Sequence, residues 1–134
     1  MTLVDSNVLI DILTRNSQWL EWSAERLNSC GTAGPVYFNE IVYSELSAKS
    51  ESESELDRAL LDLSLSLDPI PKSAYFLAGK TLDRYRRACG ARNSNLPDFF
   101  IGAHAQIAGL PILTRDVRRY RTYFPDVELI APDV

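Results

Sequence analysis

The chain has 134 residues, of which 46% are hydrophobic and 24% charged, and its net charge is −4. This size and composition predict one globular domain spanning residues 1–134. A protein that binds nucleic acid through phosphate contacts alone should be basic, so a simple basic patch is excluded. Either nucleic acid is not the partner, or the acidity is concentrated where cations bind.

The sequence predicts a cytoplasmic protein that does not associate with membranes. No apolar run approaches the ~20 residues that span a bilayer. The first residues lack a basic segment followed by a long apolar one, so no secretion signal is expected. Cys30 and Cys89 lie far apart, which is not the spacing of a redox or metal-binding pair. Two free thiols in a reducing cytoplasm are the simplest interpretation.

The first half of the chain alternates between apolar runs and helical patterns. Residues 2–4 are a short apolar strand, and the capping residues Asp5, Ser6 and Asn7 open a helix. An amphipathic stretch over 18–28 should end at Gly31 and Gly34. Residues 35–38 predict a second strand, followed by a helix that carries Glu45.

The second half continues this alternation. The Ser- and Glu-rich residues 50–55 predict a solvated turn that opens a helix over 56–67, and the proline-rich residues 68–71 predict a short strand or a connection. Helices are then expected over 73–88, 99–108 and 116–120, a loop over 90–95, and strands over 111–114 and 127–130. Strands that alternate with helices predict an α/β fold with a mostly parallel sheet.

Four acidic residues are expected near the carboxyl ends of these strands, where open parallel sheets bind ligands. Asp5 follows the first strand, and Asp116 lies two residues beyond the strand at 111–114. Glu45 lies about two turns into the helix after the second strand, and Asp98 lies in the first turn of its helix. An acid after a strand is also often a helix cap, which is the alternative for Asp5 and Asp116.

The surroundings of these acids favour a metal site. Asp98 is the only formally charged residue from Leu96 to Leu113. Carboxylates in apolar settings are costly, and converging ones raise each other's pKa values, so a cluster calls for a cation. Oxygen ligands favour Mg²⁺, with Mn²⁺ as a substitute, and such ions assist attack of water on a phosphodiester.

Arginines lie on both sides of the Asp98 helix and are candidates to hold a nucleic acid strand at the rim of an acidic pocket. The alternative for each is a solvated surface position. We expect Arg92, Arg115 and Arg118 to bind this nucleic acid strand, from a larger group of Arg84, Arg86, Arg87, Arg92, Arg115, Arg118, Arg119 and Arg121.

Other polar and aromatic residues are assigned to structure rather than chemistry. Asp11 is expected to be an exposed helix residue. His104 should face away from Asp98 around their helix, which favours a core or interface histidine. The aromatic residues expected to pack in the core or between helices are Trp19, Trp22, Tyr120, Tyr123 and Phe124.

Four segments together resemble the PIN-domain family, and within it the VapC-type toxins of toxin–antitoxin pairs. They are Leu-Val-Asp-Ser-Asn-Val-Leu-Ile-Asp at 3–11, Ser-Glu-Leu at 44–46, Leu-Pro-Asp-Phe-Phe-Ile-Gly-Ala-His-Ala at 96–105 and Ile-Leu-Thr-Arg-Asp at 112–116. The resemblance implies a three-layer sandwich with a parallel sheet between helices. It also implies that Asp5, Glu45, Asp98 and Asp116 are catalytic and bind metal, supported by Asn7 and Thr114.

The resemblance further implies an endoribonuclease that cleaves structured RNA such as tRNA or rRNA and inhibits translation. A homodimer and a small cognate antitoxin protein are implied as well. Two alternatives stay open: a catalytically inactive module that binds RNA or protein, and a phosphatase or phospho-accepting receiver domain. Against the latter, Asn7 stands where an aspartyl phosphatase has a second Asp, and residues 114–116 lack the lysine of a receiver.

Overall fold

Strands and helices alternate along the chain in the way that the hydrophobic pattern predicts. The computed structural model describes residues 1–89 and 96–132. In chain order the elements are β1 (Thr2–Val4), α1 (Ser6–Leu13), α2 (Leu20–Ala33), β2 (Val36–Phe38), α3 (Glu40–Ser47), α4 (Glu53–Asp62), β3 (Leu65–Leu67), α5 (Lys72–Cys89), α6 (Leu96–Ala108), β4 (Ile112–Leu113), α7 (Arg118–Arg121) and β5 (Leu129–Ile130).

The strands form a parallel sheet in the order β3-β2-β1-β4-β5. In the central strand β1, Leu3 pairs with Tyr37 of β2 on one side and with Ile112 of β4 on the other. Leu3 and Val4 are completely buried. Burial on both faces explains why this strand is a continuous apolar run rather than an alternating one. The predicted α/β fold with a parallel sheet is confirmed.

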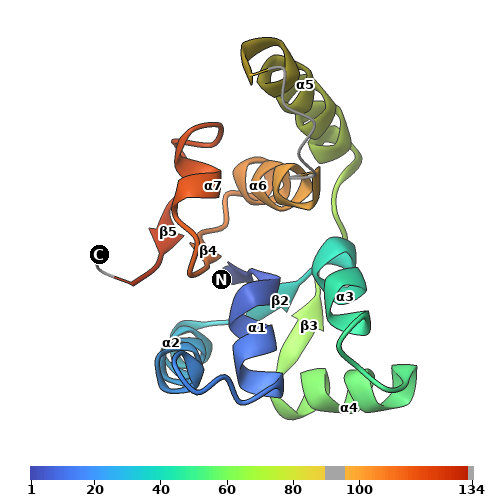
Figure 1. Cartoon of the computed structure of the whole chain (residues 1–134), viewed down its shortest axis with the longest axis vertical. Coiled ribbons are helices and arrows are strands. Elements are labelled where there is room, and N and C mark those ends of the chain that lie inside the picture. Colours follow the sequence, from blue (N-terminus) through green and yellow to red (C-terminus); the bar gives the residue numbers. More distant parts are fainter. Residues whose placement is uncertain (90–95, 133–134) are drawn as a thin grey trace.

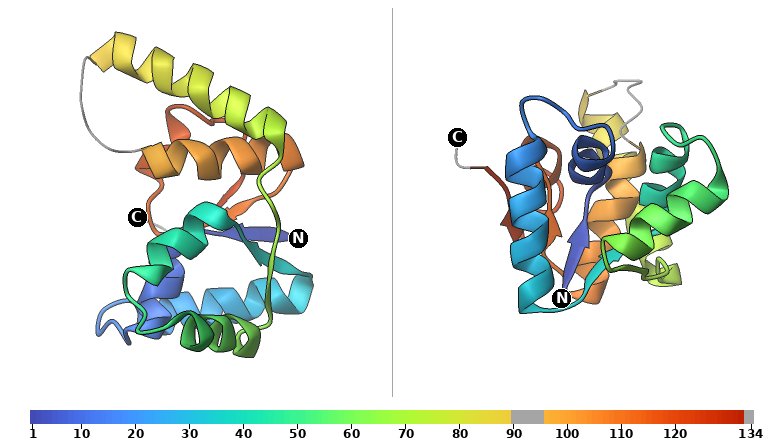
Figure 2. Two further views of the ribbon diagram at one scale, coloured as in Figure 1. Left: turned by 90° about the vertical axis from the view of Figure 1, so that its right-hand side faces the viewer. Right: turned by 90° about the horizontal axis from the view of Figure 1, so that it is seen from below.

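Helices cover both faces of the sheet, which completes the predicted three-layer arrangement. In Figure 1 and the left view of Figure 2, α6 lies over one face with α5 stacked outside it, and α1, α2 and α4 lie on the opposite side. Buried apolar side chains form a cluster that includes Leu9 of α1, Leu3 of β1 and Ile101 of α6. Over the described part of the chain, no helix is both long and apolar enough to cross a membrane.

One strand was missed, because residues 56–67 were predicted to be helical throughout. The helix α4 ends at Asp62, and Ser64 adopts a positive φ of 60°, which ends the helical path. Leu65 to Leu67 then pair with β2 as the edge strand β3. A run of three strand residues is too short to be distinguished by periodicity from the end of the preceding helix.

The other boundaries differ by smaller amounts. α2 continues through Gly31 to Ala33 and ends at Gly34, because one glycine weakens a helix without breaking it. The Ser/Glu stretch opens a helix as predicted, since Ser52 caps α4 by accepting a hydrogen bond from the backbone N–H of Glu55. The predicted loop over 90–95 lies outside the described residues.

Candidate active site

Strands are added to one side of β1 first and then to its other side. The point where this order changes, the topological switch point, is where parallel α/β sheets bind ligands. From β1 the chain builds β2 and β3 on one side, and it then crosses to build β4 and β5 on the other. The carboxyl ends of β1 and β4 are joined by a hydrogen bond from the backbone N–H of Asp5 to the Leu113 carbonyl, at 2.9 Å. The first predicted acid therefore lies at the switch point.

Asp5 is held by more contacts than a helix cap requires. Its carboxylate accepts hydrogen bonds from the backbone N–H of Ser6 at 2.8 Å, the Thr114 hydroxyl at 2.8 Å and the Tyr120 hydroxyl at 2.9 Å. The residue is 3% exposed. Burial raises the pKa of Asp5, and the bonds from Thr114, Tyr120 and Ser6 partly oppose that rise. The position therefore combines capping of α1 with a fixed, desolvated carboxyl group.

Asn7 and Thr114, the predicted supporting residues, connect the ends of β1 and β4. The Asn7 side-chain amide donates to the Thr114 hydroxyl at 3.3 Å, and its oxygen accepts from the backbone N–H of Arg115 at 3.3 Å. The Thr114 oxygen also accepts from the backbone N–H of Asp116 at 3.0 Å. This network fixes the turn after β4 relative to Asp5.

Glu45 reaches the same region from α3. Its Oε1 accepts a hydrogen bond at 2.7 Å from the hydroxyl of Ser6, the residue that follows Asp5. Partial burial raises the pKa of Glu45, the Ser6 bond lowers it, and the charge of Asp5 raises it. Two of the four predicted acids therefore influence each other directly.

Asp98 and Asp116 meet through an arginine. The Asp98 Oδ2 lies 3.1 Å from Arg119 Nη1, and the Asp116 Oδ2 lies 2.8 Å from Arg119 Nε. Burial raises the pKa of Asp98 to about 6 against the opposing charge of Arg119, and the charges of Asp5, Glu45 and Asp116 add to the rise. Each of the other three acids thus lies close enough for its charge to raise the pKa of Asp98.

Arg119 is a cation inside this acidic cluster, although its side chain is 49% exposed. Partial burial lowers its pKa, but the charges of Asp98, Asp116 and Asp5 outweigh this and raise it. Within residues 1–89 and 96–132, no three acidic, histidine or cysteine side chains are arranged to hold one metal ion. The oxygen-only donor set fits a hard divalent cation. For Asp98 and Asp116 to bind such an ion, their ion pairs with Arg119 must first break.

Tyr120 was predicted to be a core residue, and its contact with Asp5 was missed. The side chain is completely buried, and its hydroxyl donates to Asp5. Burial raises the pKa of Tyr120 well above its ordinary value, and the charges of Asp5 and Asp98 add to that rise. The available signal was the hydroxyl itself, because a buried tyrosine needs a hydrogen-bond partner that phenylalanine does not.

Arg115 and Asp11 form an ion pair that the sequence did not predict. The Arg115 guanidinium donates to both Asp11 oxygens, at 2.6 and 2.9 Å, and lies 4.9 Å from the centre of the Trp19 ring. Asp11 also accepts from the Ser23 hydroxyl and is 1% exposed, so the expectation of an exposed Asp11 is wrong. The pair links the turn after β4 to α1 and α2, and it engages an arginine that was expected to bind RNA.

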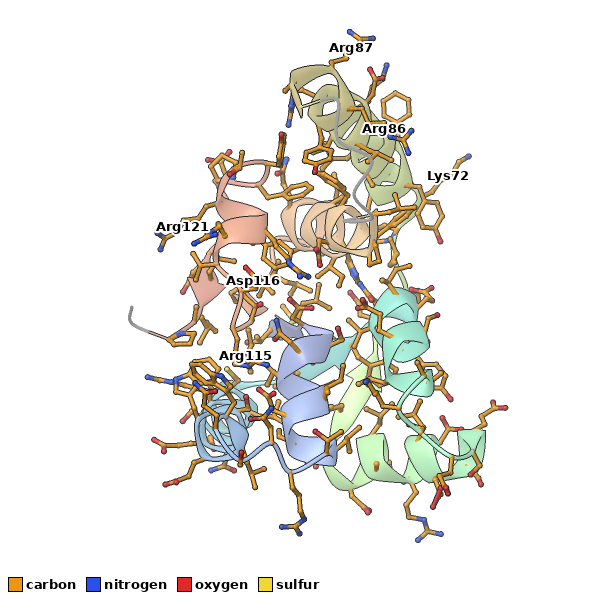
Figure 3. The ribbon with its side chains drawn as sticks, in the orientation of Figure 1. Lys72, Arg86, Arg87, Arg115, Asp116 and Arg121 are labelled. Atoms are coloured by element: carbon orange, nitrogen blue, oxygen red, sulfur yellow. The ribbon has the colours of Figure 1, made fainter. Side chains whose placement is uncertain are left out.

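The remaining predicted arginines differ in their surroundings. Arg118 is exposed on α7, next to Arg119, and Arg92 lies outside the described residues. Figure 3 shows Arg86, Arg87 and Arg121 extending away from the body of the molecule, whereas Asp116 lies inside, above α1.

His104 lies in the core, as predicted, and not among the four acids. It is completely buried, with one ring nitrogen 3.0 Å from the Asn39 amide and the other 2.8 Å from Asp68. Both nitrogens are therefore engaged by residues that follow β2 and β3.

A parallel sheet between helices, with acidic side chains gathered at its switch point, defines a PIN-like fold. The PIN domain model matches residues 2–125. The chain therefore belongs to the PIN domain family, whose fold is typical of nucleases that use divalent metals. No curated protein matches the sequence.

Solved structures of toxin–antitoxin complexes share this fold over almost the whole chain. VapBC2 from Rickettsia felis, bound to a DNA fragment from its promoter, has a TM-score of 0.73 at 17% identity and covers 98% of both chains. VapBC-1 from nontypeable Haemophilus influenzae has a TM-score of 0.69 at 17% identity, covering 97% of this chain and 96% of the other. A toxin–antitoxin complex from Klebsiella pneumoniae has a TM-score of 0.62 at 20% identity and covers 90% of each.

Proposed function

We propose that this protein is a divalent-metal-dependent endoribonuclease that hydrolyses RNA phosphodiester bonds in the cytoplasm, with Mg²⁺ as the ion and Mn²⁺ as a substitute. One observation carries the proposal. The charges of Asp5, Glu45 and Asp116 all act on the partly buried carboxyl of Asp98, and Arg119 pairs with Asp98 and Asp116. Excess negative charge in a partly buried setting is the environment that a divalent cation stabilises.

The proposed ligands and catalytic residues are Asp5, Glu45, Asp98 and Asp116. A bound divalent ion supplies Lewis acidity, which activates water and neutralises charge on the phosphoryl oxygens. Thr114 and Tyr120 hold one Asp5 oxygen and so fix the direction of its carboxyl group. Asp98 ionises less readily than an ordinary aspartate because burial raises its pKa.

Arg119 has a second use once it releases these acids. Its side chain is about half exposed, so the guanidinium can turn outwards and pair with a phosphate of the RNA. Arg118, exposed beside it on α7, is the better placed of the predicted RNA-binding residues. The Arg115 side chain is 26% exposed while paired with Asp11, so only part of its guanidinium group would be available to the RNA. Arg92 is proposed from its place in the sequence.

We further propose that the protein is the toxin of a toxin–antitoxin pair. The structural matches are to proteins crystallised as VapBC or toxin–antitoxin complexes, and in one of them with promoter DNA. This supports a small cognate antitoxin as partner, a homodimer, and inhibition of translation through cleavage of tRNA or rRNA.

One observation favours a second candidate, a catalytically inactive PIN-like module that binds RNA or protein. Arg119 bridges Asp98 and Asp116, and among the described residues no three potential ligands converge on one point. If this arrangement persists in the presence of metal, the site cannot perform metal-assisted hydrolysis.

A cleavage assay separates the two candidates. Purified protein is incubated with total tRNA and rRNA in Mg²⁺, in Mn²⁺ and in excess EDTA, and the cleaved ends are mapped. The proposal expects cleavage with either ion, none in EDTA, and loss of at least 100-fold in Asp5→Asn and Asp98→Asn. Asp83→Asn, which removes an exposed acid paired with Arg87, is the matched control and should retain activity. Cleavage that persists in EDTA, or RNA binding without cleavage in either ion, would overturn it.

A further inference from the structure

A cavity of about 310 Å³ lies next to the acidic cluster, between α5, α6 and the segment that contains α7. It shares Asp98 and Arg119 with that cluster, so a ligand in the cavity would be adjacent to the proposed catalytic site. The neighbouring positions of α5, α6 and α7 can be followed in Figure 1. We call this cavity, with its walls of Tyr85, Phe99 and Tyr123, the aromatic pocket.

Three aromatic side chains from different segments form one wall of the aromatic pocket. Tyr85 of α5, Phe99 of α6 and Tyr123 after α7 have ring centroids 5.4 to 5.6 Å apart. Phe99 is buried, whereas Tyr85 and Tyr123 are half-buried and line the cavity. The wall therefore combines one buried apolar ring with two half-buried rings that carry hydroxyl groups.

Two arginines line the cavity, and a third contacts one of its aromatic side chains. Arg118 and Arg119 line the cavity, and the Arg84 guanidinium lies 5.8 Å from the centre of the Tyr123 ring. Flat aromatic surfaces bordered by guanidinium groups are the combination that proteins use to stack bases of single-stranded nucleic acid while pairing with the phosphates. An aliphatic ligand would gain nothing from the arginines, and a simple anion would gain nothing from the rings.

We infer that the aromatic pocket binds the nucleobase of a nucleotide that neighbours the phosphate held at the acidic cluster. The inference rests on the proposed function and names how that site would recognise its substrate. Cavities that hold small ligands measure about 300 to 1,000 Å³, so this volume suits a single base with its ribose rather than a longer segment. The pocket would favour unpaired nucleotides in loops over bases in a duplex, because a paired base cannot enter it.

The test compares mononucleotides that differ only in their base with a sugar phosphate that has no base. The four nucleoside 5′-monophosphates and ribose 5-phosphate, which lacks a base, are titrated into the protein with Mg²⁺ and followed by NMR. At least one nucleotide is expected to bind roughly ten-fold more tightly than ribose 5-phosphate, the size of a single stacking contact. Tyr85→Leu and Tyr123→Leu should remove this advantage and leave the affinity for ribose 5-phosphate unchanged.

Conservative and matched variants keep the result interpretable. Tyr85→Phe and Tyr123→Phe retain the ring and should retain the advantage. Tyr75→Leu removes an exposed ring on α5 that packs against Phe100, away from the aromatic pocket. This variant should also retain the advantage of the nucleotide over ribose 5-phosphate. Equal binding of all four nucleotides and ribose 5-phosphate, or an advantage that survives both leucine variants, would overturn the inference.

The two proposals fail separately. RNA cleavage by the wild-type protein without any contribution from the base refutes the aromatic pocket alone. A base-dependent advantage in a protein that cleaves no RNA refutes the nuclease and leaves the aromatic pocket as a binding site.

Discussion

Arg119 and a divalent ion should compete for the same carboxylates, so Arg119→Gln is expected to increase the affinity of the protein for Mn²⁺. In the structure the arginine occupies Asp98 and Asp116 through contacts of 3.1 and 2.8 Å. An ion that uses both acids must first break these pairs. Glutamine keeps most of the length of the side chain and removes its charge.

The size of the increase follows from the strength of the two pairs. The Arg119 side chain is 49% exposed, and exposed ion pairs contribute about 0.2 to 1 kcal/mol each. Together they contribute about 0.5 to 2 kcal/mol, which corresponds to a roughly 2- to 30-fold change in affinity. The assay is titration with Mn²⁺ followed by electron paramagnetic resonance, with Arg121→Gln on the same helix as the control. Unchanged or weaker binding in Arg119→Gln would refute the competition.

Three further substitutions test the fold and the charge of the site. Because the raised pKa of Asp98, about 6, favours its protonated form in the folded state, its contribution to stability is present below about pH 4 and lost as the pH rises through 6. Asp98→Asn should therefore raise the free energy of unfolding of the metal-free protein by about 1 to 2 kcal/mol at pH 7.5 and by little at pH 4 in urea titrations; a gain independent of pH contradicts this. Gly102→Ala would place Cβ 2.3 Å from the buried Phe124 ring and should cost about 1 to 3 kcal/mol, whereas Gly79→Ala, which meets nothing within 4 Å, should be neutral or stabilising; equal thermal shifts would contradict the packing. Asp11→Ala removes one partner of a nearly buried ion pair and should cost about 2 to 4 kcal/mol, and a cost below about 1 kcal/mol would show that the pair is not maintained in solution.

The fold was largely predictable because its central strands, β1 and β4, are buried on both faces. The apolar run at 2–4, the capping residues after it and the strand at 111–114 gave the correct order of elements around the switch point. The missed strand β3 lies at the edge of the sheet, where Ser66 and Leu67 are exposed and carry no strong pattern. Its ladder with β2 is a long-range interaction that local spacing does not encode.

The acids of the candidate site could be proposed from the sequence, but their hydrogen-bond and ion-pair partners could not. Asp98 was proposed because it is a single charge in an apolar segment, and in the structure the charges of Asp5, Glu45 and Asp116 raise its pKa. The pairing of Arg119 with two of them could not be anticipated. Eight arginines lie before or after that helix in the sequence, and nothing in the sequence distinguishes the one whose side chain reaches these acids. The same holds for Asp11, whose burial depends on Arg115, 104 positions away.

A crystal structure with Mn²⁺, using the anomalous signal of the ion, is the most direct measurement. The account predicts density for manganese between Asp5, Glu45, Asp98 and Asp116, with the Arg119 guanidinium turned away from Asp98. A crystal at saturating Mn²⁺ with no ion at these carboxyls, and with Arg119 still bridging two of them, would contradict it.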